Sequence, residues 1–304
     1  MQPAQRHLLP GQRWHFQHGP IDIIIAADGE AAALQAAHNA AWVRLQTVLA
    51  ELVAELPLLR QPVAGSNPLQ GAIARRMWAA CAPLVGAADG FITPMAAVAG
   101  AVAQSLIGAY QRPGIQRAWV NNGGDMALHL APGTQVQVGL VADLASFDGA
   151  ALAHSAAGLL RVDTTFAVLA SSPVRGVATS GWRGRSLSRG IADSVTVLAR
   201  SGAEADAAAT VIANAVDLPS PAAAAAAGIV RQPASVVRDD SDLGQIAVTV
   251  SVPTLPIAVV QQALQRGLAC AQRLQAAGRV HAALLTCQGQ LCRLQPAQVA
   301  ELVQ

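Results

Sequence analysis

A glycine-rich turn between two apolar stretches is the feature that most constrains how this chain can fold. The segment Asn121–Asp125, with the sequence Asn-Asn-Gly-Gly-Asp, follows the apolar stretch Arg117–Val120 and precedes Met126–Leu130. Asn-Gly and Gly-Gly pairs in such a place are the strongest short-range signal for a β-hairpin, because both central residues of the turn need positive φ. The sequence therefore predicts a hairpin whose turn leaves bare backbone beside an acidic side chain.

A second signal, later in the chain, marks the start of a helix. Ser201 and Glu204 form the capping-box pattern Ser-x-x-Glu, which satisfies free N–H groups of a first helical turn. Asp206 and Thr210 then lie four residues apart and share one face of the helix. Two interpretations are open. Asp206 either favours the positive end of the helix while Thr210 packs, or both side chains serve as ligands.

Alternating strand and helix patterns indicate an α+β fold. A strand at Ile21–Ala26 precedes a long helix that Asp28 is expected to cap and that reaches about Leu56. The pair Asn67-Pro68 predicts the start of a further helix that ends near Val85. We expect one extended mixed sheet with helices packed on it. The other predicted strands are Arg117–Val120, Met126–Leu130, Gln135–Val141, Gly158–Thr164, Gly176–Thr179, Ser194–Ala199, Ile246–Val252 and the hairpin Val280–Thr286 with Gln290–Leu294.

Composition predicts a soluble globular protein. The net charge of +2 is too small to produce the field that nucleic-acid binding needs, and the chain contains no lysine, so every basic side chain is an arginine. The uncharged stretch Gly90–Gln111 is long enough for a membrane span. Polar residues and proline interrupt it, and its alanines and glycines supply little transfer energy, so we expect no span. The start of the sequence, Met1–His7, lacks an apolar signal region, which favours the cytoplasm.

Two further groups of residues are interpreted as structural. The four cysteines lack the spacing of metal ligands, so we expect buried free thiols in a reducing compartment. The acidic run Asp239–Asp242 has neither a partner acid nor the spacing of a calcium loop, and it is predicted to be a solvated loop. The cysteines are Cys81, Cys270, Cys287 and Cys292.

The order of the motifs resembles that of the ApbE-like superfamily, whose best-known members are the FAD:protein FMN transferases. Those proteins carry an Asn-x-Gly-Gly-Asp turn and a later Asp-Ala-x-x-Thr helix start, which Asn121–Asp125 and Asp206–Thr210 match. Thr93–Ala103 resembles their small-residue loop and helix, and Ala178–Gly181 resembles their Thr-Ser-Gly strand end. The best-matched region is residues 92–214. The resemblance implies an ApbE-like mixed sheet with helices packed on it, in a single domain over residues 1–304 or in two intimately packed subdomains.

The resemblance also implies a ligand, FAD, and a magnesium ion beside its diphosphate. Asp206 and Thr210, with a backbone carbonyl that we assign to Ala99, would hold the magnesium, and oxygen ligands with phosphate suit that ion. From the sequence alone, the glycine pair also fits a plain hairpin turn without a ligand. The residues expected to line the flavin cleft are Thr93, Met95, Ala97, Gly100, Asn121, Gly123, Gly124, Asp125, Thr179, Ser180 and Gly181.

One departure from the transferases bears on activity. They commonly carry a lysine in the small-residue loop where this chain has Gly100, and no lysine exists elsewhere to replace it. The chain therefore resembles a compact, soluble branch that binds a flavin nucleotide and has no assigned activity. The alternatives are a magnesium-dependent FAD:protein FMN transferase or FAD pyrophosphatase, and a non-catalytic structural or interaction protein that kept the fold. The expected partner is a small-molecule nucleotide, and a homo-oligomer is left open.

Overall fold

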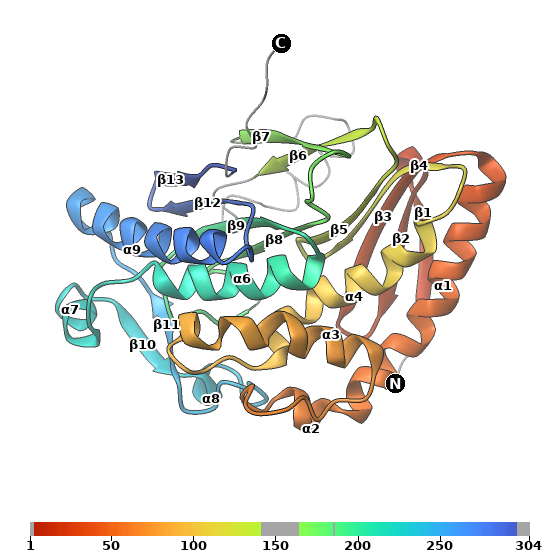
Figure 1. The fold of residues 1–304 in the computed structure, drawn as a ribbon. Coiled ribbons are helices and arrows are strands. Elements are labelled where there is room, and N and C mark those ends of the chain that lie inside the picture. The colour runs from red at the N-terminus through yellow and green to blue at the C-terminus, as the bar shows by residue number, and fades with distance from the viewer. Residues whose placement is uncertain (1–2, 141–163, 185, 297–304) are drawn as a thin grey trace, which may run out of the picture.

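A nine-stranded sheet organises the molecule in a computed structural model that describes residues 3–140, 164–184 and 186–296 (Figure 1). Every pairing between its strands is antiparallel. The predicted α+β class, with helices packed on one extended sheet, is confirmed, and the sheet is antiparallel where a mixed sheet was expected. The order across the sheet is β1 (Gln5–Leu9), β2 (Arg13–His18), β3 (Ile21–Gly29), β4 (Ile115–Asn122), β5 (Asp125–Leu130), β8 (Gly176–Ser180), β9 (Ser194–Ala199), β12 (Ala282–Cys287) and β13 (Gln290–Leu294).

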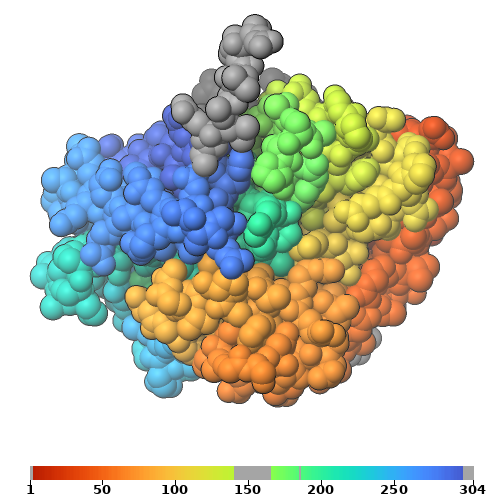
Figure 2. All heavy atoms as spheres, viewed as in Figure 1, coloured from red at the N-terminus to blue at the C-terminus, as the bar shows by residue number. Residues whose placement is uncertain are grey.

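The long helices pack against this sheet and against one another. Helix α1 (Ala31–Ala54) contacts β2 and β3, while α4 (Val98–Ile107) and α6 (Gly202–Ala215) contact the central strands. Helix α3 (Ala72–Cys81) packs on α4 and α6, and α9 (Ile257–Ala276) packs on α6, β12 and β13. In Figure 2, α6 shows only as a small area between its neighbours, so it is the most enclosed of these helices on this face.

Short elements complete the described chain. Two small hairpins pair β6 (Gln135–Leu140) with β7 (Thr164–Leu169) and β10 (Val230–Pro233) with β11 (Ala247–Ser251). The short helices are α2 (Leu56–Leu59), α7 (Pro221–Ala226) and α8 (Ala234–Val237), and 3-10 turns lie at Pro10–Gln12, Ala82–Ala88, Pro94–Ala97 and Gly108–Tyr110. Within the described residues, no helix is both long and apolar enough to cross a membrane.

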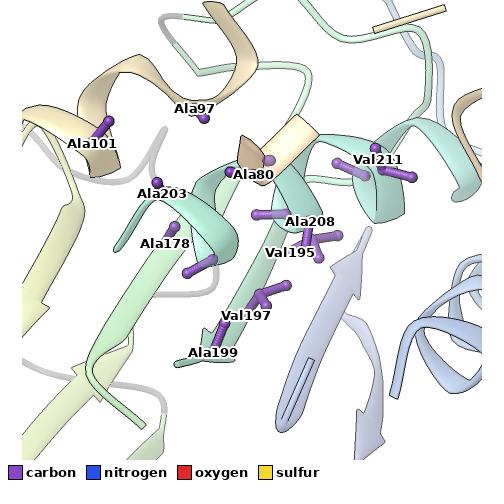
Figure 3. Close-up of a cluster of buried hydrophobic side chains, with 14 of the residues drawn as sticks. Ala80, Ala97, Ala101, Ala178, Val195, Val197, Ala199, Ala203, Ala208 and Val211 are labelled. Atoms are coloured by element: carbon purple, nitrogen blue, oxygen red, sulfur yellow. The ribbon is translucent and has the colours of Figure 1, made fainter. Parts of the chain in front are cut away.

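The main core lies between the sheet and the helices and consists largely of small side chains (Figure 3). Because alanine and glycine keep neighbouring backbones close, α4 and α6 cross tightly. A Cβ built on Gly100 would lie 2.1 Å from the carbonyl oxygen of Gly202. The crossing brings the beginnings of α4 and α6 together. The core residues labelled in Figure 3 are Ala80, Ala97, Ala101, Ala178, Val195, Val197, Ala199, Ala203, Ala208 and Val211.

A smaller apolar cluster occupies the other face of the central strands. Successive residues of β5 alternate between the faces, so Ala127 joins the main core while Leu128 joins the second cluster. The β6–β7 hairpin covers this cluster with Val136, Val138 and Val168. The central strands β5, β8 and β9 are therefore largely covered on both faces.

Two helix starts differ from the sequence prediction. Strand β3 continues to Gly29, so Asp28 belongs to the strand, and α1 begins at Ala31 after Glu30. Helix α3 begins at Ala72, because the Asn67 side chain accepts a hydrogen bond from the Leu69 N–H at 3.0 Å and forms a local turn instead. The predicted strand Gly158–Thr164 lies outside the described residues except for its last residue.

Candidate functional site

The β4–β5 hairpin ends in the predicted glycine turn. Gly123 has φ +66° and Gly124 has φ +115°, and both residues are exposed. The Asn121 side-chain oxygen accepts a hydrogen bond from the Gly124 N–H at 2.8 Å and closes the turn. A φ of +115° lies beyond the left-handed region that asparagine tolerates, so Gly124 needs to be glycine. The hairpin prediction is confirmed, and the backbone of its turn is accessible.

Asp125 follows this turn and connects two strands through its carboxylate. It accepts a hydrogen bond from the backbone N–H of Thr179 at 3.0 Å, next to the short pairing of β5 with β8. The residue is 9% exposed. Burial raises the pKa of Asp125 from 3.8 to about 7, although the hydrogen bond from Thr179 acts in the opposite direction.

Asp206 lies in the second turn of α6, close to Asp125. The predicted helix start at Ser201 is confirmed, because the Ser201 hydroxyl accepts a hydrogen bond from the Glu204 N–H at 3.3 Å. The Gly100 N–H donates to the Asp206 carboxylate at 2.9 Å. Burial raises the pKa of Asp206 well above its usual value, and the nearby charge of Asp125 raises it further. Asp125 is buried and Asp206 half-buried, so the two acids share one poorly solvated environment.

Oxygen atoms of three kinds gather around this pair of acids. The Asn122 side-chain nitrogen donates to the carbonyl oxygen of Ala99 at 3.1 Å, which ties β4 to the start of α4. Thr210 is half-buried and lies one helical turn after Asp206. Carboxylate, carbonyl and hydroxyl oxygens are the donors that a hard divalent cation prefers. Among the described residues, no cluster of three or more His, Cys, Asp or Glu side chains could hold a metal, so such a site would depend on backbone and hydroxyl oxygens as well.

Asp242 also approaches this region, and the sequence interpretation missed it. The Thr93 hydroxyl donates a hydrogen bond to the Asp242 carboxylate, which fastens the acidic loop to the start of the 3-10 turn Pro94–Ala97. Burial raises the pKa of Cys81 well above its usual value, and the charges of Asp206 and Asp242 raise it further. The interpretation of this run as a solvated loop is therefore wrong for Asp242, although Asp239 and Asp240 are exposed. No local sequence signal could reveal a contact between residues so far apart in the chain.

The segment after Thr179 is held mainly by contacts within the protein. A Cβ on Gly181 would lie 2.3 Å from the carbonyl oxygen of Asp193, so packing alone accounts for this glycine. The guanidinium of Arg183 lies 4.9 Å from the centroid of the Trp182 ring and 4.0 Å from the Asp193 carboxylate. Ser180 is half-buried at the end of β8.

Hydrogen bonds, together with the electrostatic interaction between Asp125 and Asp206, thus bring five of the predicted site residues into one cluster. Ala99, Gly100, Asp125, Thr179 and Asp206 come from two helices and two strands, and we call them the acidic cluster. Met95 and Ala97 lie on the 3-10 turn that precedes α4 and packs on α6. A cavity of about 950 Å³ lies elsewhere, at the C-terminal end of α6, and none of the residues predicted to bind flavin or magnesium lines it.

Comparison with known sequences identifies relatives along most of the chain. A family model described as AbpE bacteria matches residues 6–293. A UPF0280 protein of Methanosphaerula palustris is 33% identical over 207 residues, which cover 67% of this chain and 77% of that protein. A UPF0280 protein of Methanospirillum hungatei JF-1 is 36% identical over 124 residues, which cover 40% of this chain and 45% of that protein.

Comparison with solved structures finds proteins of similar length. The apo form of the Pseudomonas stutzeri flavinyl transferase ApbE is 13% identical, with a TM-score of 0.47 and coverage of 96% of this chain and 94% of that one. The flavin transferase ApbE from Vibrio cholerae is 11% identical, with a TM-score of 0.48 and coverage of 97% and 98%. Both TM-scores are below 0.5, so these structures establish no residue-level correspondence.

Proposed function

Because the chain belongs to the AbpE bacteria family, we propose that it binds a flavin nucleotide, FAD, beside a divalent cation at the start of α6. The observation that carries the proposal is the pairing of Asp125 with Asp206. Burial raises the pKa of both carboxyls, and the charge of one raises that of the other. A cation bound beside Asp206 would supply the missing counter-charge, and magnesium prefers such oxygen donors.

The proposed cation ligands are Asp206, Thr210 and the carbonyl oxygen of Ala99. When bound, magnesium would neutralise the charge of a diphosphate and polarise its oxygens. The protein groups have separate roles. The Gly100 N–H orients the Asp206 carboxylate at 2.9 Å, and the Asn122 side chain orients the Ala99 carbonyl. In this proposal Asp125 adds negative charge to the cluster from behind the glycine turn.

The proposed flavin cleft extends from the acidic cluster along the glycine turn. The exposed backbone of Gly123 and Gly124 permits close approach of a ligand, which a side chain at either position would hinder. Half-buried Asn121, Thr179 and Ser180 supply polar groups nearby. The remaining proposed contacts come from the stretch before and into α4, namely Thr93, Met95, Ala97 and Gly100.

Binding without transfer is the form of this function that the site supports best. Transfer of FMN to a threonine needs a group that activates the hydroxyl and stabilises charge at the cleaved pyrophosphate. The chain has no lysine, and at Gly100 a side chain would collide with Gly202, since its Cβ would lie 2.1 Å from that carbonyl oxygen. A magnesium-dependent transferase or FAD pyrophosphatase remains the enzymatic alternative, and a structural protein without ligand is the non-enzymatic one.

The direct test is the visible absorption of the purified protein, followed by titration of the colourless form with FAD in the presence and absence of magnesium. We expect binding that magnesium strengthens. Asp206→Asn and Thr210→Ala should weaken the magnesium-dependent part by about tenfold or more, because charge-assisted contacts to the cation are lost. Asp240→Asn, a matched change at an exposed acid, should have no effect. A protein that is colourless and takes up no FAD would remove the proposal.

The enzymatic alternative has its own measurement. The protein is incubated with FAD, magnesium and an acceptor that bears a flavinylation threonine, and the mass of the acceptor is then determined. We expect no change in mass even where FAD binds. An increase by one FMN unit that disappears in Asp206→Asn would replace the binding assignment with that of a transferase.

A further inference from the structure

The cavity of about 950 Å³ at the C-terminal end of α6 has a lining unlike that of the acidic cluster. It lies among α6, α7, β10, β11 and α9, which gather at one side of the molecule (Figure 1). Its charged residues are four arginines and two acids, an excess of positive charge in a protein whose net charge is only +2. They are Arg189, Arg231, Arg266, Arg273, Asp89 and Asp217.

Each acid of the cavity already has an arginine partner. The Arg231 Nη2 atom lies 2.6 Å from the Asp217 Oδ1 atom, and these side chains are only 16% and 20% exposed. The Arg231 Nε atom also donates to the Thr249 hydroxyl at 3.3 Å. The Arg189 Nη2 atom lies 3.5 Å from the Asp89 carboxylate. After these two pairings, two guanidinium groups remain in excess.

Those two guanidinium groups, of Arg266 and Arg273, belong to one face of α9. They are seven residues apart, so they lie on the same side of the helix, and the small residue Ala269 between them also lines the cavity. The sequence of α9 contains no aspartate or glutamate. A favourable interaction with the helix C-terminus would explain Arg273, which is in the last turn, but not Arg266 in the middle.

Two arginines elsewhere are paired within their own segments. Arg44 on α1 forms an ion pair with Glu51 of the same helix at 2.5 Å, and Arg200, which precedes α6, pairs with Glu204 in the first turn of that helix at 3.4 Å. On α9 the two arginines are exposed and line the cavity. Arg266 lies close enough to Asp217 to lower its pKa, although Asp217 is bound to Arg231, and Arg273 forms a side-chain hydrogen bond with Cys270. Neither arginine forms an ion pair at close range with a described acid, so their remaining donors are available to a ligand.

Asn214 adds a neutral donor to the same cavity. Its side-chain oxygen accepts hydrogen bonds from the Arg189 N–H at 2.8 Å and from the Ser188 hydroxyl at 3.1 Å. These two bonds orient the amide. Within the described residues, no protein acceptor contacts the amide nitrogen. Apolar residues form the rest of the wall, including Leu218, Pro219 and Ile229. The lining thus combines a cationic side with an apolar one.

We propose that this cavity binds a small organic anion that carries a phosphate or pyrophosphate group. Guanidinium groups match phosphate oxygens in geometry and charge, and the apolar wall would cover the organic part. The volume lies in the range of small-molecule sites. The site is separate from the proposed flavin site, since it lies at the opposite end of α6, a helix of about 20 Å.

Isothermal titration calorimetry with inorganic pyrophosphate, in the absence of magnesium, tests the proposal. We expect the wild-type protein to bind and Arg266→Gln/Arg273→Gln to bind about tenfold more weakly or not at all, because charge-assisted hydrogen bonds are lost. Arg279→Gln, which lies after the end of α9 and does not line the cavity, is the matched control and should bind normally. Thermal unfolding checks that all variants are folded.

Three results of the anion titrations would overturn the proposal. They are no binding of pyrophosphate, equal binding by the double variant, and equally tight binding of sulfate, which would reduce the site to a general attraction for anions. Reciprocal titrations separate this site from the proposed flavin site. Asp206→Asn should leave pyrophosphate binding unchanged, and the double arginine variant should leave magnesium-dependent FAD binding unchanged. Loss of FAD binding in the double variant would also overturn the proposal of a second site.

Discussion

The two ends of α6 place half-buried acids in opposite surroundings. At the beginning of the helix, Asp206 faces a second acid, Asp125, and backbone N–H groups. At its end, Asp217 lies 2.6 Å from Arg231, and Arg266 lies close enough to lower its pKa. Burial raises the pKa of all three carboxyls, but only Asp217 has arginines that oppose the effect. Burial alone therefore does not identify a binding site. The acids at the beginning of α6 lack a positive partner, which favours a bound cation there, whereas the cavity at its end has an excess of arginines, which favours a bound anion.

The largest expected effect is that of a substitution at the crossing of α4 and α6, which positions the acidic cluster. Gly100→Lys, which would restore the residue type of the transferase loop, should destabilise the protein by about 3 kcal/mol or more, because the new Cβ would lie 2.1 Å from the Gly202 carbonyl oxygen. The neighbour is backbone and cannot rotate away. Thermal or denaturant unfolding measures the change.

A control position lies at the C-terminal end of α4. Gly108 follows α4 directly, and a Cβ there would meet nothing within 4 Å. Gly108→Ala should therefore leave stability unchanged or raise it slightly, since alanine restricts the unfolded chain more than glycine does. A stable Gly100→Lys variant would show that the crossing can relax, and the missing lysine would no longer argue against transfer.

The next prediction concerns Asp217, the acid that forms an ion pair with Arg231. Asp217→Asn leaves the partly buried guanidinium of Arg231 without its carboxylate partner, so we expect a loss of about 2 kcal/mol in the free energy of unfolding. The same substitution should strengthen pyrophosphate binding, because it removes a negative charge from the cavity. If stability does not change in urea unfolding, the ion pair contributes little and the contrast between the two ends is weaker than proposed.

Substitution of Asp206, which has no arginine partner, should change the free energy of unfolding in the opposite direction. Asp206→Asn removes a buried charge that repels Asp125, so we expect the metal-free protein to gain about 1 kcal/mol at pH 8. Unfolding is measured with a chelator present. A large loss of stability would contradict the prediction, because it would mean that the hydrogen bonds from Gly100 and Ala99 to the carboxylate outweigh the repulsion.

Short sequence patterns predicted those features of the site that depend on residues close together in the chain. The glycine turn and the Ser201 cap depend on residues within a few positions of each other, and both are confirmed. The contact of Thr93 with Asp242 and the crossing of Gly100 with Gly202 join distant segments, so no pattern in one stretch could show them. The arginines of α9 that line the cavity likewise can be interpreted only when β10 and the end of α6 are placed opposite them.

Other hydrogen bonds and ion pairs of the two expected cap residues explain why the predicted helix starts were misplaced. Asn67 resembles a helix cap, but its side chain accepts from the N–H two residues later and forms a turn before α3 begins. Asp28 also resembles a cap, yet it pairs across the sheet with Arg117 and forms an ion pair with the same residue at 2.5 Å. Caps and turns use the same side chains, and tertiary contacts decide between them.

The smallest expected effect is the pH dependence of stabilisation by magnesium. The pKa of Asp125 rises from 3.8 to about 7 in the folded protein, so the folded state holds more protons than the unfolded state between these values. Stability of the metal-free protein from this group is thus fully present below about pH 4 and is lost as the pH rises through 7. Magnesium needs the deprotonated acids, so it should raise Tm by a few degrees at pH 8 and leave it unchanged at pH 5. Thermal unfolding at both pH values, with and without millimolar magnesium, measures this, and Asp206→Asn should abolish the difference. An equal shift at the two pH values, or one that persists in the variant, would show that these acids do not hold the cation.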